Sequence, residues 1–238
     1  MDSLPALRLT VVLNAMINTP LTVPEAVAVV QGDDVVHHVV DPEGRLGLDA
    51  DGAVPLATAL PVIAARESDM WVLALPVPGA AGALRGPAAL NADAVAVGEV
   101  VVAGRAGIAL VPHRVGPAVQ WRVWPAEPPA PPPSPNEADG ALSETVIAAA
   151  DALGRLEVAA GVRPSGPVRL ATAPGLSTRQ QARIDRALRL HEACTVALES
   201  DGTAISVWEA ETRLRELRRV RAAAAATLCA TATWASHP

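Results

Sequence analysis

The sequence contains no Phe, no Tyr and no Lys, so all nineteen basic residues are Arg. The missing residues have A/T-rich codons, whereas the abundant Ala, Val, Gly, Pro and Arg have G/C-rich codons. The base composition of the genome therefore explains the absences, and they indicate no special function. Their physical consequence is a core of Val, Leu, Ala and Ile, in which five Trp are the only large aromatic rings.

Cysteine is also scarce. Cys194 and Cys229 stand 35 residues apart, with no CxxC pair and no His at zinc-binding spacing. Two cysteines exclude a framework of disulfides and suit the reducing cytosol. The first residues lack a basic start followed by an apolar run, and no apolar run is long enough to span a membrane. We therefore expect a cytoplasmic protein with no membrane contact, no metal and no cofactor.

A proline-rich segment divides the chain. The residues "WPAEPPAPPPSPNEADG" contain seven prolines between Pro125 and Pro135. A stretch of this kind should join neither a sheet nor a helix and should run as extended polyproline II, so residues 125–138 are interpreted as a spacer. The alternative is a ligand for an aromatic-lined groove, although no basic neighbour is present to orient it. The linker predicts two domains, residues 1–124 and 139–238.

Helical and strand patterns are mixed before the linker. Residues 4–17, 21–31 and 54–67 are helical candidates, and the second has Thr22 and Glu25 at capping-box spacing. Further along, "MWVLALPV" is typical of a buried strand, while "GEVVVAG", "GIALVPH" and "AVQWRVW" predict a meander of short strands. We therefore expect an α+β protein whose N-terminal domain has a small, mostly antiparallel sheet and flanking helices.

Every strong pattern after the linker is helical. One helix is expected at about 139–159, and two more begin at Ser177 and Ser206, where a Gln or Glu stands at capping-box spacing. Three long helices with short loops predict a C-terminal helical hairpin or bundle.

The two halves of the chain differ in charge. Residues 1–150 hold 7 Arg and 16 acids, whereas residues 151–238 hold 12 Arg and 9 acids. The difference favours attraction between the domains, or an Arg-rich helical surface that meets an acidic partner.

The segment "GDDVVHHVVD", residues 32–41, is the most chemical-looking part of the chain. On a helix or on a strand it can place a carboxylate near an imidazole, as a metal or catalytic site would require. The carboxylate stabilises the imidazolium, which opposes metal binding, and no third His or Cys stands at a standard spacing. A solvated polar edge around two buried valine pairs is therefore favoured. The members of this acid–histidine cluster are Asp33, Asp34, His37, His38 and Asp41.

The second candidate is the glycine-rich segment "PVPGAAGALRGPAALNADAV". A strand, a glycine-rich loop and then a helix is the layout that cradles phosphates with backbone N–H groups. The loop matches neither GxGxxG nor GxxxxGK[ST], and it lacks the Lys and hydroxyl that grip phosphate and magnesium. A simple connection is therefore favoured over an anion or small-ligand site. The residues of such a site would be Gly79, Gly82, Arg85, Gly86 and Asn91.

The third candidate is the arginine content of the last two helices. Guanidinium groups there could bind nucleic-acid phosphates or an acidic protein. Acids precede arginines by four positions, as in Asp185–Arg189, which favours a solvated face of mutually neutralising charges. The low isoelectric point also argues against nucleic-acid binding without excluding it. The residues of this face are Arg179, Arg183, Arg186 and Arg189.

The chain resembles a family of uncharacterised proteins from high-G+C actinobacteria. The resemblance rests on "LRLTVVLNAM", "GDDVVHHVV", "LALPVPG", "LRGPAALNADAVAVGEVVV", "GIALVPH" and "WRVWPAEPP" in that order, and it covers most of the chain. The family has no assigned activity, so the resemblance implies no catalytic role for any residue. This chain has "PGAAGALRG" where similar sequences tend to have an acid after "PVPG", which weakens a metal site in the loop.

No catalytic residue can be assigned from the sequence, because it contains no GxSxG, no HExxH and no credible Cys–His–Asn set. The leading prediction is a non-enzymatic cytoplasmic adaptor or regulator that acts through contacts with a protein partner of unknown identity, or as a homodimer through its Ala-rich helices. The alternative is a small-ligand or anion-binding protein or an enzyme, in which the loop around Arg85 and the acid–histidine cluster share a pocket. Nucleic-acid association through the Arg-rich helices is a third hypothesis.

Overall fold

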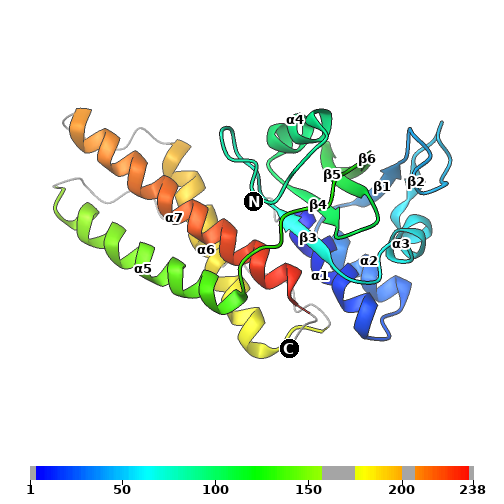
Figure 1. Cartoon of the computed structure of the whole chain (residues 1–238), viewed down its shortest axis with the longest axis horizontal. Helices are drawn as coiled ribbons and strands as arrows, with labels where there is room; N and C mark the ends of the chain where they lie inside the picture. The colour runs from blue at the N-terminus through cyan, green and yellow to red at the C-terminus, as the bar shows by residue number, and fades with distance from the viewer. Residues whose placement is uncertain (1–3, 157–174, 200–206, 236–238) are drawn as a thin grey trace.

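The computed structural model describes residues 4–156, 175–199 and 207–235. They form an α+β structure, which confirms the predicted fold class. A mostly antiparallel sheet with flanking helices fills one end of the molecule, and a long helical arm projects away from it (Figure 1).

Three helices pack against one face of the sheet, and each confirms a predicted helix. They are α1 (Pro5–Asn18), α2 (Val23–Gln31) and α3 (Leu56–Ala64). α1 is buried on all sides from its start to Ala15, because it lies between the sheet, its two neighbours and the helical arm. α2 begins with the predicted capping box, in which the Glu25 carboxylate accepts the Thr22 N–H at 3.0 Å.

The described residues form a six-stranded sheet in the order β2-β1-β6-β5-β4-β3. The strands from β3 to β6 pair antiparallel in succession, which confirms the predicted meander, and β1 pairs with β6 in parallel. The strand bounds are β1 Val36–Val40, β2 Val54–Pro55, β3 Trp71–Ala74, β4 Val100–Ala103, β5 Ile108–Val115 and β6 Ala118–Pro125.

Strand β1 settles the alternatives left open for "GDDVVHHVVD", because its central residues are extended rather than helical. Side chains alternate along a strand, so His37 and Val39 are buried while His38 lies on the opposite face. The two histidines therefore cannot act on the same group.

The opposite face of the sheet carries α4 (Ala88–Val97), which follows the glycine-rich loop as expected. Alternation along β6 shows how the faces divide. Trp121 is fully buried on the side of α1, whereas Arg122 is exposed and stacks 4.3 Å above the ring of Trp124. Asp93 of α4 accepts the Trp124 Nε1–H at 2.7 Å, so that ring anchors the helix to the sheet.

The proline-rich segment departs from the prediction at both ends. Pro125 pairs with Ile108 as the last residue of β6, and α5 begins at Pro135. Proline fits the start of a helix because the first N–H groups have no partner within the helix. Ser134 caps it: the Glu137 carboxylate accepts the Ser134 N–H at 3.0 Å, and Ser134 Oγ accepts the Glu137 N–H at 3.3 Å. The helix therefore starts inside the predicted spacer.

The helical arm consists of three long helices, α5 (Pro135–Gly154), α6 (Thr178–Glu199) and α7 (Val207–Thr233). They pack along one another, with α7 in contact with both partners (Figure 1). The capping box predicted at Ser177 is present, since Ser177 Oγ accepts the Gln180 N–H at 3.3 Å. The one predicted at Ser206 lies outside the described residues. Each helix in the described ranges is too short or too polar to cross a membrane.

The C-terminal end of α7 covers the exposed edge of the sheet at β3. Asn14 of α1 donates from Nδ2 to the carbonyls of Trp71 at 2.8 Å and Ala232 at 3.0 Å, and its Oδ1 accepts the Trp71 N–H. Thr233 Oγ1 accepts the Leu73 N–H at 3.3 Å. An edge strand presents unpaired backbone groups, so these contacts occupy positions that another strand would otherwise fill.

The sheet and the arm share one apolar core. The cluster that surrounds α1 continues without a break into all three arm helices. The arm residues in this cluster are Leu142, Ile184, Ala187, Leu188, Ala224, Leu228 and Ala232.

Candidate ligand-binding cleft

A cleft of about 1040 Å³ lies between the sheet and the helical arm. Its walls come from three distant parts of the sequence, namely the loop after β3, the proline-rich segment and one side of α6 and α7. The lining is mostly apolar, with a few charged or polar groups, which is the usual character of a small-molecule site.

α7 contributes one continuous stripe to the cleft. The positions in this stripe are three, four or one residues apart, so they share one side of the helix. Alanines occupy the middle of the stripe, and their small methyl groups leave space in the cleft beside the helix. Two arginines stand at one end of the stripe and a cysteine at the other. The stripe residues are Arg218, Arg221, Ala222, Ala225, Ala226 and Cys229.

The two arginines of the stripe differ from their neighbours. Arg215 and Arg219 each lie 3.2 Å from the carboxylate of Glu216 on the same helix. Within the ranges that the structure describes, neither Arg218 nor Arg221 has an acid within ion-pair distance. Their charges are therefore available to a group bound in the cleft.

The opposite wall combines a tight turn with prolines. Val77 and Ala80 exchange two backbone hydrogen bonds of 3.0 and 2.9 Å, which hold the loop in a turn. The Ala130 N–H donates to the Ala83 carbonyl at 2.9 Å and ties the proline-rich segment to that loop. Residues 131–133, all prolines, then line the cleft. Because proline fixes φ, this wall is stiff without large side chains.

Glu99 lines the cleft just before β4. Its side chain is buried, and Oε2 accepts the N–H of Ala6 in the first turn of α1 at 2.8 Å. Burial raises the pKa of Glu99 to about 7, although that hydrogen bond and the charges of Arg114 and Arg8 act in the opposite direction. The carboxyl group therefore changes its protonation state near neutral pH.

His191 of α6 and Cys229 of α7 also face the cleft. Burial and the charge of Arg221 lower the pKa of His191 to about 4, so its imidazole is neutral at pH 7. Burial raises the pKa of the Cys229 thiol to about 12, so the thiol stays protonated and is a poor nucleophile.

The sequence does not indicate that the polar groups of this cleft belong together. Glu99 and His191 belong to no motif, and Arg218 and Arg221 stand in the arginine-rich last helix, which was considered only as a surface for nucleic acid or an acidic protein. The fold alone brings these segments together. One signal was available in the sequence: Arg218 and Arg221 precede a run of alanines at helical spacing, which marks a helix face with charge but little bulk.

The glycine-rich loop contributes to the cleft in part. Of the five residues predicted for an anion site, Gly82 lines the cleft, next to Ala80 and Ala83. Arg85 is exposed and does not line it. Gly86 accepts the Glu127 N–H at 3.0 Å, so its carbonyl serves the loop itself. The other two predicted residues, Gly79 and Asn91, also lie outside the lining.

Asp34 is the centre of the acid–histidine cluster. Its Oδ2 pairs with Arg8 and accepts the His37 Nε2–H at 3.1 Å, while Oδ1 accepts a bond from Arg114 at 2.9 Å. Burial opposes ionisation, but the hydrogen bonds and the two guanidinium charges together lower the pKa of Asp34. Gly32 makes room for Arg8, because a Cβ at this position, where φ is +52°, would lie 1.8 Å from Arg8 Nη1.

His37 is held in its neutral form. Trp121 Nε1–H donates to His37 Nδ1 at 3.2 Å, so the proton of the imidazole is on Nε2 and points at Asp34. Burial lowers the pKa of His37, while Asp34 acts in the opposite direction. Both ring nitrogens are occupied by protein partners, so the geometry is that of a structural network.

The remaining members of the cluster lie apart. Asp41 is fully buried and accepts backbone N–H groups from the turn that follows β1. His38 faces the other side of the sheet, and Asp33 is exposed. No member of the cluster lines the cleft, so the predicted convergence with the glycine-rich loop does not occur. Among the described residues, no group of three or more His, Cys, Asp or Glu is placed to hold a metal ion.

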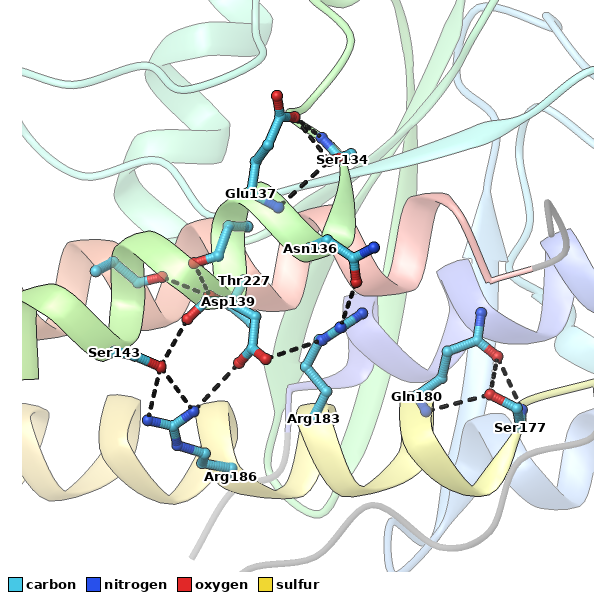
Figure 2. A network of polar contacts seen from close by, with 12 residues as sticks. Ser134, Asn136, Glu137, Asp139, Ser143, Ser177, Gln180, Arg183, Arg186 and Thr227 are labelled. Atoms are coloured by element: carbon cyan, nitrogen blue, oxygen red, sulfur yellow. Dashed lines mark hydrogen bonds and ion pairs between the residues drawn. The ribbon is translucent and has the colours of Figure 1, made fainter.

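Figure 2 shows the polar contacts of two residues of the predicted arginine face. Arg183 and Arg186 extend from α6 toward α5, where they lie 3.5 and 3.3 Å from the carboxylate of Asp139. Arg183 also donates to Asn136 Oδ1 at 2.9 Å, and Arg186 donates to Ser143 Oγ at 3.2 Å. These arginines join two helices of the arm.

The prediction of one solvated arginine face is therefore wrong for Arg183, which is buried. Arg179 and Arg189 are exposed. Arg179 and Arg183 line a second, more polar cavity of about 830 Å³ near the starts of α5 and α6.

Family models match both parts of the chain. Residues 6–137 match a model described as "Rv1486c-like protein, N-terminal domain", and residues 136–229 match "Rv1486c-like protein, C-terminal domain". The chain belongs to the Rv1486c-like family. This family is named after a mycobacterial protein, and the match confirms the resemblance seen in the sequence. The two Rv1486c-like domains meet at residues 136–137, within the proline-rich segment. Searches of curated proteins and of solved structures gave no match.

Proposed function

We propose that this member of the Rv1486c-like family binds a small molecule in the cleft between its sheet and its helical arm. One observation carries the proposal: an apolar cleft of ligand size is lined by two arginines without acidic partners among the described residues. Glu99 and His191, whose pKa values are strongly displaced by burial, line the same cleft, and such groups concentrate at functional sites.

Binding without covalent chemistry fits this lining best. The thiol of Cys229 is protonated at physiological pH and is no nucleophile. The imidazole of His191 has a pKa of about 4, far below the range in which a general base works well at neutral pH. These two groups therefore offer neither a nucleophile nor a base at neutral pH, and we propose ligand binding as the function of the cleft.

Filling the cleft tests this function. Ala226 is exposed on the cleft side of α7, so Ala226→Trp should block the cleft with little effect on folding. Nile red, a neutral apolar dye, should fluoresce when it binds the wild-type protein and bind at least about tenfold more weakly to Ala226→Trp. Ala150→Trp, at an exposed position of α5 outside the lining, is the matched control and should bind like wild type. Equal binding to Ala226→Trp would contradict the proposal.

A protein-contact function remains a second proposal, carried by a different observation. Ile147, Val207 and Trp208 of the helical arm expose 63%, 76% and 65% of their surface, which is unusual for large apolar residues. A second copy of the chain is the partner predicted from its Ala-rich helices. Sedimentation equilibrium should then show a dimer that dissociates more readily in Trp208→Ser, by about tenfold in Kd. A wild-type monomer at high concentration would contradict it.

A further inference from the structure

We propose that the ligand of the cleft is an amphipathic anion, with an acidic headgroup on Arg218 and Arg221 and an aliphatic body between the alanines of α7 and residues 131–133. The inference rests on the proposed function and names the chemical class that this lining would select.

The two arginines of the cleft indicate the charge of the ligand headgroup. Arg218 and Arg221 stand three positions apart, so their guanidinium groups leave the helix on the same side and can hold one headgroup together. Arg215 and Arg219, which point elsewhere, pair with Glu216. Guanidinium groups bind carboxylate and phosphate through paired hydrogen bonds, so an oxyanion is the matching headgroup.

The net charge of the lining residues also favours an anionic ligand. Glu99 is the one acid among the described residues that line the cleft, and its Oε2 already accepts the Ala6 N–H. Burial raises its pKa to about 7, so it carries less than a full negative charge near neutrality. His191 adds no charge, because its imidazole is neutral. Two positive charges therefore meet at most one negative charge, and an anion is favoured over a cation.

The shape of the lining selects the body of the ligand. Small and aliphatic groups from α7, from the β3 loop and from the proline-rich segment form the walls. Among the described lining residues, His191 carries the sole aromatic ring, so a flat aromatic ligand would find little to stack on. An alkyl chain follows such a slot, and the burial of each CH₂ group stabilises the complex.

Competition against Nile red tests the headgroup. Decanoate and decyl phosphate should displace the dye from the wild-type protein, whereas decan-1-ol, with the same chain and no charge, should displace it about tenfold less well. Displacement by one or both anions, with decan-1-ol weaker, supports the proposal. Equal displacement by decan-1-ol, or no displacement by either anion, would overturn it.

Variants then test the two arginines. Arg218→Gln combined with Arg221→Gln should weaken decanoate binding about tenfold more than it weakens binding of the uncharged Nile red. Arg179→Gln combined with Arg189→Gln, at exposed positions of α6 outside the lining, removes the same number of charges and is the matched control. Unchanged decanoate affinity in the first double variant would overturn the assignment. Nile red binding reports the cleft itself, so a wild-type protein that does not bind the dye would refute the proposed function. A wild-type protein that binds the dye but does not release it to either anion would refute only this inference.

Discussion

Glu99 serves α1 as a capping residue from outside the helix. Leu4, at the N-cap, makes no side-chain hydrogen bond, and the first turn of α1 contains no acid. Glu99, which is 93 residues away, accepts the Ala6 N–H instead and places an oxygen at the positive end of the helix dipole. This capping position buries the carboxyl group, and burial raises its pKa to about 7.

The raised pKa makes stability depend on pH. The folded pKa of Glu99 lies above its unfolded value, so ionisation of the carboxyl group lowers the free energy of unfolding. The stability linked to the protonated carboxyl is fully present below the unfolded pKa and is lost as pH rises through 7. Glu99→Gln cannot ionise, so its free energy of unfolding should exceed that of wild type at pH 8 by up to about 3 kcal/mol, relative to their difference at pH 5. Urea unfolding at both pH values measures this. Exposed Glu144→Gln is the control, and a constant difference for Glu99→Gln would contradict the argument.

Residue-level roles were the least predictable part of the molecule. "GDDVVHHVVD" looked chemical, and a structural outcome was favoured, but the reason could not be read from the segment. Arg114 reaches Asp34 from 80 residues away, and Trp121 reaches His37 from 84. Trp121 occupies Nδ1 of His37, and Arg8 and Arg114 together occupy both oxygens of the Asp34 carboxylate. A local pattern contains no information about these distant partners.

Among the elements, α5 shows how strongly local chemistry sets a boundary. The prolines before it suggested a spacer, yet Ser134, Pro135 and Glu137 form a complete helix start. Sequence analysis identified the same device at Thr22 and Ser177, where no proline run obscured it. Helices and the meander are predictable because capping and alternation are local, whereas a run of prolines does not reveal that its last member begins a helix.

Removing this cap gives an element-scale prediction. Ser134→Ala leaves the Glu137 N–H without its acceptor, so the free energy of unfolding should fall by about 1 kcal/mol. Ser134→Asp keeps an acceptor in the same place and should lose much less. Urea denaturation of the three proteins measures both changes. A loss of the same size in Ser134→Asp would show that the hydroxyl acts in some way other than capping.

At the scale of the whole molecule, Asn14 is one of the residues that connect the sheet to the helical arm. Its side chain bonds α1 to β3 and to the last turn of α7, which makes it a link between the sheet and the helical arm. Buried groups that lose a partner pay the full penalty of desolvation, and Asn14 serves several at once.

Breaking that link should destabilise both parts together. Asn14→Leu leaves the backbone groups of Trp71 and Ala232 without this partner, so the free energy of unfolding should fall by about 3 kcal/mol. Asn18→Leu, an exposed position on the same helix, should change it little. Urea unfolding followed by both circular dichroism and tryptophan fluorescence measures the loss. A small effect in Asn14→Leu would contradict the role of this side chain.

The cleft belongs to this scale as well, which is why sequence analysis did not find it. Its lining comes from the loop around Ala80, from residues 131–133 and from α7. Each piece alone looks like a connection, a spacer or a solvated helix. Their meeting depends on how the arm docks on the sheet, and docking is decided by long-range contacts such as those of Asn14 rather than by any local pattern.

The cover over β3 has a consequence for biosynthesis. Leu73 leaves the ribosome 160 residues before Thr233, the residue whose hydroxyl accepts its N–H. Until α7 has been translated, a nascent sheet exposes both an unpaired strand edge and the apolar surface that the arm will bury. Such intermediates are prone to aggregate. Stalled or prematurely terminated synthesis should therefore yield chains that need chaperone protection, whereas the completed chain closes its own vulnerable edge.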